Sequence, residues 1–118
     1  MENQITTFFE EKIAACQAAV TALREDNRAD EAVFEKIRMN VFNIFATVYK
    51  AGGSVSGGDS RRQLEFLRNQ LEKITGDWQS AAETFRKHGD CNKVHIEQTK
   101  LAVAEEIRQK LTEWSDDK

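Results

Sequence analysis

The chain of 118 residues contains no proline and only six glycines, and four of these glycines fall within residues 51–58. Proline and glycine are the residues that most strongly interrupt helices, so the stretches on either side of this segment are almost free of helix breakers. The chain also has no apolar run approaching the ~20 residues that a membrane-spanning helix needs. We therefore expect long helices, one break at residues 51–59, and no membrane partner.

Cysteine is equally scarce, since Cys16 and Cys91 are the only two and form no CxxC motif. The first residues, Met1–Gln4, lack the basic region and following apolar run of a secretory signal. Two widely separated thiols in a chain without an export signal predict reduced cysteines rather than a disulfide framework, and a cytoplasmic protein.

The sequence has no excess of basic residues, with 17 Lys and Arg against 20 Asp and Glu and a formal net charge of −3. Nucleic-acid binding relies on a basic surface that neutralises phosphates, so we expect no nucleic-acid partner. The 40% apolar and 31% charged content is that of an ordinary globular domain, and the length predicts a single one.

Amphipathic patterns predict four helices, at residues 4–25, 30–50, 60–88 and 92–114. The third is the clearest, because its apolar residues alternate between three- and four-residue steps. These residues are Leu64, Leu67, Leu71, Ile74, Trp78, Ala81 and Phe85. Short connections at residues 26–29 and 89–91 predict antiparallel neighbours. The expected fold is all-α: an antiparallel up-down-up-down four-helix bundle built from two helical hairpins, 1–50 and 60–114, in one domain spanning 1–118.

The Gly/Ser-rich segment 51–59 is predicted to be a flexible linker between the two hairpins, because it is long for a bundle connection. It would either cross the end of the bundle or allow the hairpins to exchange between two chains. No lysine follows its glycines as a phosphate-binding loop requires. The helix start that comes next, with Arg61 and Arg62, is a generic place for an anion.

Three further signals concern helix ends. Ser60 with Gln63 fits a capping box at the start of the third helix, and Gly89 fits a C-terminal stop. Thr7 with Glu10 fits a second capping box, which would make the first helix begin later than residue 4.

Both histidines and one cysteine fall within eight residues, as His88, Cys91 and His95. Imidazole nitrogen and thiolate sulfur both suit zinc, so this turn is a candidate metal site. The spacing supplies only half of a four-ligand structural site, and the alternative is a polar turn with a histidine at a helix C-terminus. Apart from zinc at this turn, we expect no cofactor. A di-iron site is excluded because neither histidine has a glutamate three residues before it.

The predicted size and topology resemble those of histidine phosphotransfer domains, which are four-helix bundles. That family carries an exposed helical histidine followed by Lys and Gly at the third and fourth positions. Here His95 is followed by Ile96-Glu97-Gln98-Thr99, so the chain departs from the motif. The resemblance implies phosphotransfer only as the lesser of the alternative functions.

Three basic residues, Lys12, Arg38 and Lys100, fall within or beside the apolar arcs of their helices. In an up-down-up-down bundle Arg38 and Lys100 would come to similar heights, with Lys12 about one or two turns away, and the three would line an anion-binding cleft between helices. The alternative is that their aliphatic stems cover the core while their charges reach water. They would otherwise pair with nearby carboxylates, namely Glu11, Glu35 or Glu97.

The helix at residues 30–50 has an apolar arc wider than a one-sided surface helix needs. Phe42 and Tyr49 on this arc, together with Phe66, which points away from the seam of the third helix, are therefore candidate interface residues. Cys16, Trp78 and Trp114 lie on apolar faces and are expected in the core, whereas Cys91 is expected to be exposed. We expect a non-enzymatic protein–protein interaction module that forms a homodimer. The alternative is a small ligand-, anion- or metal-binding protein.

Overall fold

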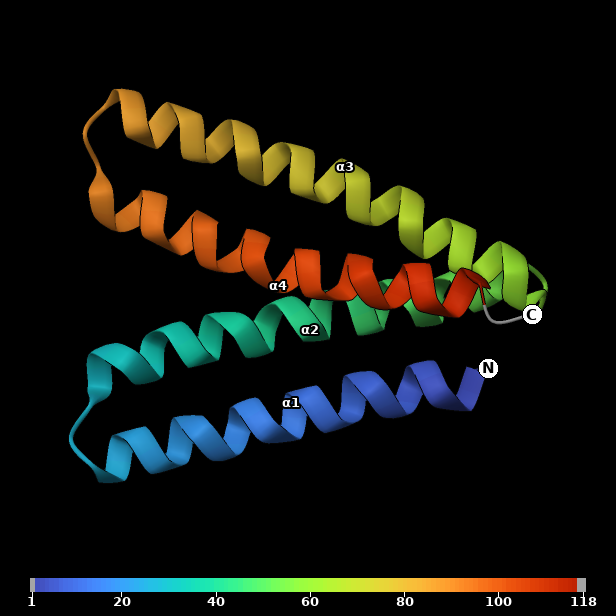
Figure 1. Cartoon of the computed structure of the whole chain (residues 1–118), viewed down its shortest axis with the longest axis horizontal. Coiled ribbons are helices and arrows are strands. Elements are labelled where there is room, and N and C mark those ends of the chain that lie inside the picture. Colours follow the sequence, from blue (N-terminus) through green and yellow to red (C-terminus); the bar gives the residue numbers. More distant parts are fainter. Residues whose placement is uncertain (1, 117–118) are drawn as a thin grey trace.

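The computed structural model describes the backbone of residues 2–116 and the side chains of residues 4–115. The chain forms four helices: α1 (Glu2–Glu25), α2 (Ala29–Val55), α3 (Ser60–Lys87) and α4 (Cys91–Asp116). Consecutive helices run in opposite directions, so that the α1–α2 and α3–α4 turns lie at one end and the α2–α3 turn at the other (Figure 1). The all-α four-helix bundle is thereby confirmed. None of these helices is long and apolar enough to cross a membrane.

Left-handed backbone conformations end the first helix of each hairpin. Asn27 has φ of 58° after α1, and Gly89 has φ of 71° after α3. The Gly89 N–H donates to the carbonyl of Arg86, which satisfies one of the carbonyls left free at the helix end. The predicted stop at Gly89 is confirmed, and the two tight turns hold each hairpin antiparallel.

The predicted linker 51–59 is wrong in its first half, because α2 continues through Gly52 and Gly53 to Val55. The connection to α3 is only Ser56–Asp59, and Gly57 and Gly58 make its turn with φ of 65° and 88°. Gly52 is buried, and a Cβ placed on it would lie 2.9 Å from Cδ2 of Phe66 on α3. Glycine at position 52 therefore lets α2 and α3 approach closely, and this close packing offsets the low helix propensity of glycine.

Asp59 caps α3, since its side chain accepts from the backbone N–H groups of Arg61 at 3.0 Å and Arg62 at 3.3 Å. The predicted capping box from Ser60 to Gln63 is wrong, because Ser60 already lies inside the helix. Gln63 is buried instead and donates from Nε2 to the backbone carbonyl of Tyr49 at 2.7 Å, which joins α3 to α2. The later start of α1 suggested by Thr7 is also wrong, since α1 begins at Glu2.

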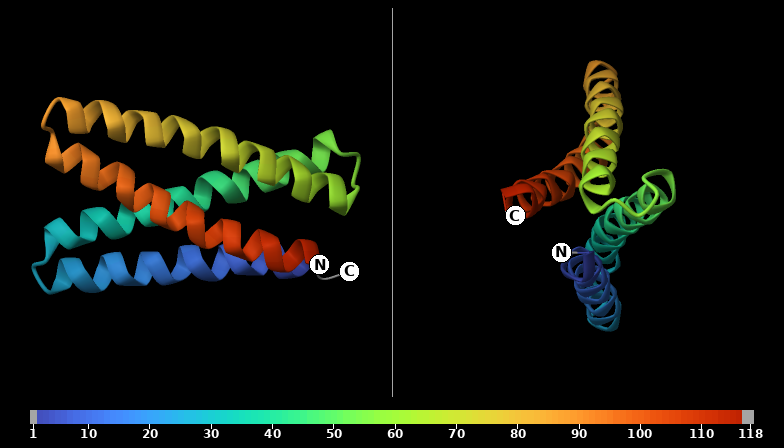
Figure 2. Two further views of the ribbon diagram at one scale, coloured as in Figure 1. Left: turned by 45° about the horizontal axis from the view of Figure 1, so that its top comes forward. Right: turned by 90° about the vertical axis from the view of Figure 1, so that its right-hand side faces the viewer.

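Helix α2 is central, packing against α1, α3 and α4. The two hairpins cross each other rather than lying parallel, so α2 and α4 form an X in the tilted view (Figure 2). Large apolar side chains from all four helices fill the core. They include Ile5, Phe9, Phe42, Phe45, Leu67, Leu71, Ile107 and Leu111. Trp114 is buried with them and Trp78 packs against them, as the sequence predicts.

Candidate functional sites

Two of the three predicted anion-binding residues meet at one carboxylate. Lys12 Nζ of α1 lies 2.7 Å from Glu106 Oε1 of α4, and Arg38 Nη2 of α2 lies 3.8 Å from Glu106 Oε2. Arg38 also lies 3.7 Å from Glu35, one turn earlier on its own helix. Glu106 therefore links both helices of the first hairpin to α4, and its charge neutralises the cations that would attract an anion.

Lys100 occupies a separate place on α4. Its Nζ donates to Glu97 at 3.0 Å and lies 5.4 Å from the centre of the Trp78 ring. The pairings of Arg38 with Glu35 and of Lys100 with Glu97 are two of the carboxylate pairings that the sequence offers as the alternative to an anion site. Lys12 pairs with Glu106 and not with Glu11. The structure thus brings Lys12 and Arg38 together, leaves Lys100 apart, and pairs each with a carboxylate.

Cys16 lies beside the Glu106 cluster and is buried, as predicted. Burial raises the pKa of the Cys16 thiol, and the neighbouring carboxylate of Glu35 raises it further. A buried thiol held in its neutral form is a poor nucleophile and a poor metal ligand, because both roles need the thiolate. Cys16 is therefore a structural residue.

The turn between α3 and α4 that carries His88 and Cys91 is exposed to solvent. His88 caps the C-terminus of α3, Cys91 begins α4, and both are exposed. His95 stacks on Phe34 of α2, with ring centres 4.3 Å apart. Among the described side chains, those of residues 4–115, no three from His, Cys, Asp or Glu come together so that they could hold a metal ion. The structure therefore does not assemble the predicted ligand set of His88, Cys91 and His95.

The three predicted interface residues belong to the chain's own packing. Phe42 is 1% exposed and Tyr49 is 4% exposed, so in the single chain both are core residues and neither offers surface to a partner. Phe66 is half-buried, with its ring against Gly52. Most of the wide apolar arc of α2 is covered within the monomer because α2 contacts three helices.

A different line on α2 is exposed. Val33, Ile44 and Val55 are the exposed large hydrophobic residues of the described chain, at 54%, 39% and 72%. They follow one another at intervals of eleven residues, which is close to three helical turns, so they lie along one side of α2. We call these three residues the α2 stripe. Sequence reasoning missed it, although the eleven-residue interval was visible.

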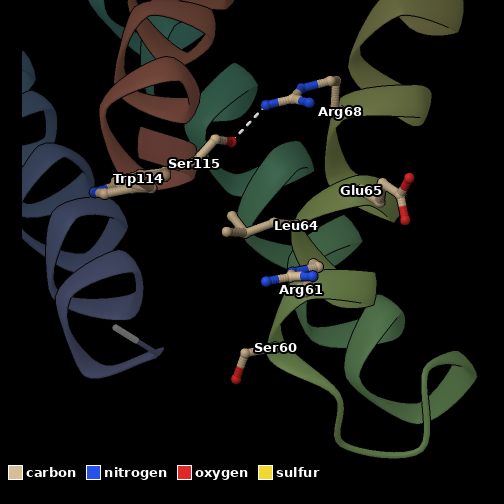
Figure 3. A pocket seen from close by; sticks show the side chains of 7 residues that line it. All are labelled: Ser60, Arg61, Leu64, Glu65, Arg68, Trp114 and Ser115. Atoms are coloured by element: carbon tan, nitrogen blue, oxygen red, sulfur yellow. Dashed lines mark hydrogen bonds between the residues drawn. The ribbon is translucent and has the colours of Figure 1, made fainter. Parts of the chain in front are cut away.

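A pocket of about 590 Å³ opens between the start of α3 and the end of α4. Its lining is Ser60, Arg61, Leu64, Glu65, Arg68, Trp114 and Ser115. Figure 3 shows Arg61, Leu64 and Arg68 projecting from α3 toward α4, whereas the carboxylate of Glu65 points away. Arg68 donates to the hydroxyl of Ser115 across the mouth. We call this site the α3–α4 pocket.

The two arginines of the α3–α4 pocket differ from most others in the chain. Arg28, Arg38, Arg62, Arg86 and Arg108 each have a carboxylate within ion-pair distance. Among the side chains of residues 4–115, no carboxylate pairs with Arg61 or Arg68, and Arg68 donates to the neutral hydroxyl of Ser115. The pocket therefore carries two guanidinium charges that no described side chain neutralises.

The sequence contained part of this signal. Arg61, Leu64 and Arg68 stand at i, i+3 and i+7, which is the spacing of one helix face. What the sequence could not supply is the opposing wall, because the angle between α3 and α4 at this end depends on the packing of both hairpins. Of the two arginines at the predicted generic anion site, Arg61 lines the pocket and Arg62 does not.

The geometry defines an all-α bundle of two crossed hairpins that carries the α3–α4 pocket and the α2 stripe. Comparison of the chain with protein-family models, with curated proteins and with solved structures finds no match.

Proposed function

We propose that this protein is a non-enzymatic interaction module that forms a homodimer through the α2 stripe. The observation that carries the proposal is the placement of Val33, Ile44 and Val55 on one side of α2. Leaving branched apolar side chains in water is unfavourable by roughly 25 cal/mol for each Å² that a partner would cover. A partner helix that runs along the stripe removes all three from water together.

The spacing favours a second copy of the chain as that partner. Val33 and Val55 are equidistant from Ile44, eleven residues to each side. A twofold axis through Ile44 would pair two α2 helices antiparallel, with Ile44 against its counterpart and Val33 against Val55 of the other copy. Such a self-complementary patch is what a twofold-symmetric dimer requires.

The polar side chains that flank the centre of the stripe agree with this pairing. Asn40, Asn43 and Thr47 are exposed there and uncharged, so two copies would meet without like-charge repulsion. Lys36 would come to the height of residue 52 of the other copy, and therefore away from the other Lys36.

The free thiols Cys16 and Cys91 are consistent with a cytoplasmic setting.

Light scattering after size exclusion, at tens of micromolar protein, tests the assembly. The native chain is expected at twice its 13.5 kDa mass. Ile44→Glu is expected to be monomeric, because it places two carboxylates on the twofold axis. Ala18→Glu, an equal charge change on the exposed face of α1, is the control and should remain dimeric. A monomeric native protein, or a dimer that survives Ile44→Glu, would overturn the proposal.

Cysteine cross-linking tests the symmetry, in a Cys91→Ser background that removes the exposed thiol. Ile44→Cys should oxidise to a covalent dimer, since position 44 meets itself on the axis. Val33→Cys alone should not, because the two copies of position 33 would be about 33 Å apart along the helices. Combining Val33→Cys with Val55→Cys should restore the cross-link. Equal cross-linking at 33 and 44 would rule out the antiparallel arrangement.

A further inference from the structure

We propose that the α3–α4 pocket binds a small organic anion, namely a carboxylate attached to an apolar ring or short chain. The inference is independent of the dimer, because the lining residues come from α3 and α4 and none belongs to the α2 stripe. The α3–α4 pocket has a volume of about 590 Å³, which lies within the range of small-molecule sites in proteins.

The charge of the pocket selects an anion. Arg61 and Arg68 stand seven residues apart on one face of α3, about 10 Å along the helix axis. Guanidinium groups bind carboxylates through paired hydrogen bonds, and these bonds are stronger than those between neutral groups. Both groups are free of described carboxylate partners, and Glu65, the one acidic lining residue, directs its carboxylate away from the space between the helices (Figure 3).

The apolar surface of the pocket selects the rest of the ligand. Leu64 lies between the two arginines on α3, and Trp114 lines the pocket from α4, with its ring directed away from α3 toward Phe8 and Phe9 of α1 (Figure 3). Leu64 and Trp114 are buried residues of the core, so this surface is held rigidly by the packing behind it. A ligand that places a ring or short chain here would bury apolar area while its carboxylate reaches Arg61 or Arg68.

The hydroxyls of Ser60 and Ser115 complete the rim. Ser115 already accepts a hydrogen bond from Arg68 across the mouth, which shows that the distance between the two walls can be bridged by one polar group. A carboxylate that replaces this hydroxyl as the acceptor of Arg68 would exchange a neutral hydrogen bond for a charge-assisted one.

Calorimetric titration with 2-naphthoate tests the proposal, and 2-naphthamide is the uncharged probe of the same shape. Naphthoate is expected to bind saturably at one site per chain and about tenfold more tightly than the amide, the size expected for loss of one charge-assisted hydrogen bond. Amide chemical shifts should place the naphthoate contacts at residues 60–68 and 114–115.

The chain offers a matched control for the arginines. Arg61→Gln combined with Arg68→Gln should weaken naphthoate binding about tenfold or more and leave naphthamide unchanged. Arg62→Gln removes one positive charge next to Arg61, where the double variant removes two. Arg62 pairs with Asp59 and lies outside the pocket, so binding should stay within about twofold. All these positions are exposed, and circular dichroism will confirm that the helices are retained.

Four outcomes would overturn the proposal. They are no saturable binding of naphthoate, equal binding of the amide, an equal loss in Arg62→Gln, and shift changes centred away from the pocket. Equal binding of the amide would mean that the pocket is only an apolar surface. An equal loss in Arg62→Gln would mean that net charge, and not the placed pair of arginines, attracts the ligand.

Discussion

Gly52 on α2 and Phe66 on α3 approach so closely that a Cβ on Gly52 would lie 2.9 Å from Cδ2 of the Phe66 ring. Gly52→Ala should therefore destabilise the protein by about 1 kcal/mol, since the cost of overpacking exceeds the gain in helix propensity. The free energy of unfolding in urea, taken from the transition midpoint and slope, measures the effect.

Gly76 supplies the matched control for this substitution. It lies in the middle of α3 with no atom near an added Cβ, so Gly76→Ala should stabilise the protein by about 0.5–1 kcal/mol. In a Phe66→Ala background the penalty at Gly52 should disappear. If Gly52→Ala stabilises as much as Gly76→Ala, the close approach of α2 and α3 is not present in solution.

Glu106 joins Lys12 and Arg38 across three helices, so Glu106→Gln should remove two ion pairs between the hairpins. All three side chains are partly exposed, and the expected loss of stability is therefore below about 1 kcal/mol, shrinking as salt is added. Glu113→Gln breaks an exposed pair within α4 alone and should change the unfolding free energy less. A loss that does not respond to salt would mean that packing, not charge, explains the effect.

The two thiols should differ widely in reactivity. Cys91 is exposed and should react quickly with N-ethylmaleimide under native conditions, whereas Cys16 should react only as the bundle opens. Mass spectrometry over time should show one rapid addition and a second that is accelerated by urea. Two rapid additions in the native protein would show that α1 does not stay packed.

Alkaline pH should lower stability through Cys16. Its pKa is raised by burial and by Glu35 from the ordinary value of 9.0. Well below pH 9 the thiol is neutral in both states. As the pH approaches and passes 9 the unfolded chain ionises first, so the unfolding free energy falls as pH rises. Cys16→Ala should remove this part of the pH dependence. The comparison is of urea unfolding at pH 7 and pH 10 in the two proteins, and identical slopes against pH would contradict it.

The local signals in the sequence differ in how far they could be trusted. Along α3 the apolar steps from Leu64 to Phe85 leave one buried face, and a helix is the only regular structure that gathers them. The end of α3 requires a residue in the left-handed conformation, and Gly89 predicted this stop correctly. The same logic failed at Gly52 and Gly53, because there glycine serves close packing inside a helix, and propensity alone cannot distinguish the two uses.

The candidate sites likewise depend on tertiary packing that local sequence patterns do not reveal. The apolar arc of α2 spans about half its circumference and predicts an interface at Phe42 and Tyr49, yet three neighbouring helices cover most of that arc within the single chain. The sequence predicts Arg38 at the height of Lys100, whereas the structure joins Arg38 to Lys12 through Glu106, a residue far along the chain whose position follows only from the crossing of the hairpins.

The sequence by itself determined four helices, their pairing into hairpins and the face that each one buries, because these depend on contacts within a few residues and on short turns. Only the tertiary structure decided which apolar residues remain outside, which charges are neutralised, and that a pocket opens between α3 and α4. Those features depend on the angle at which two hairpins cross. That angle is settled by side-chain packing among distant residues, such as Phe66 on Gly52, which no local pattern records.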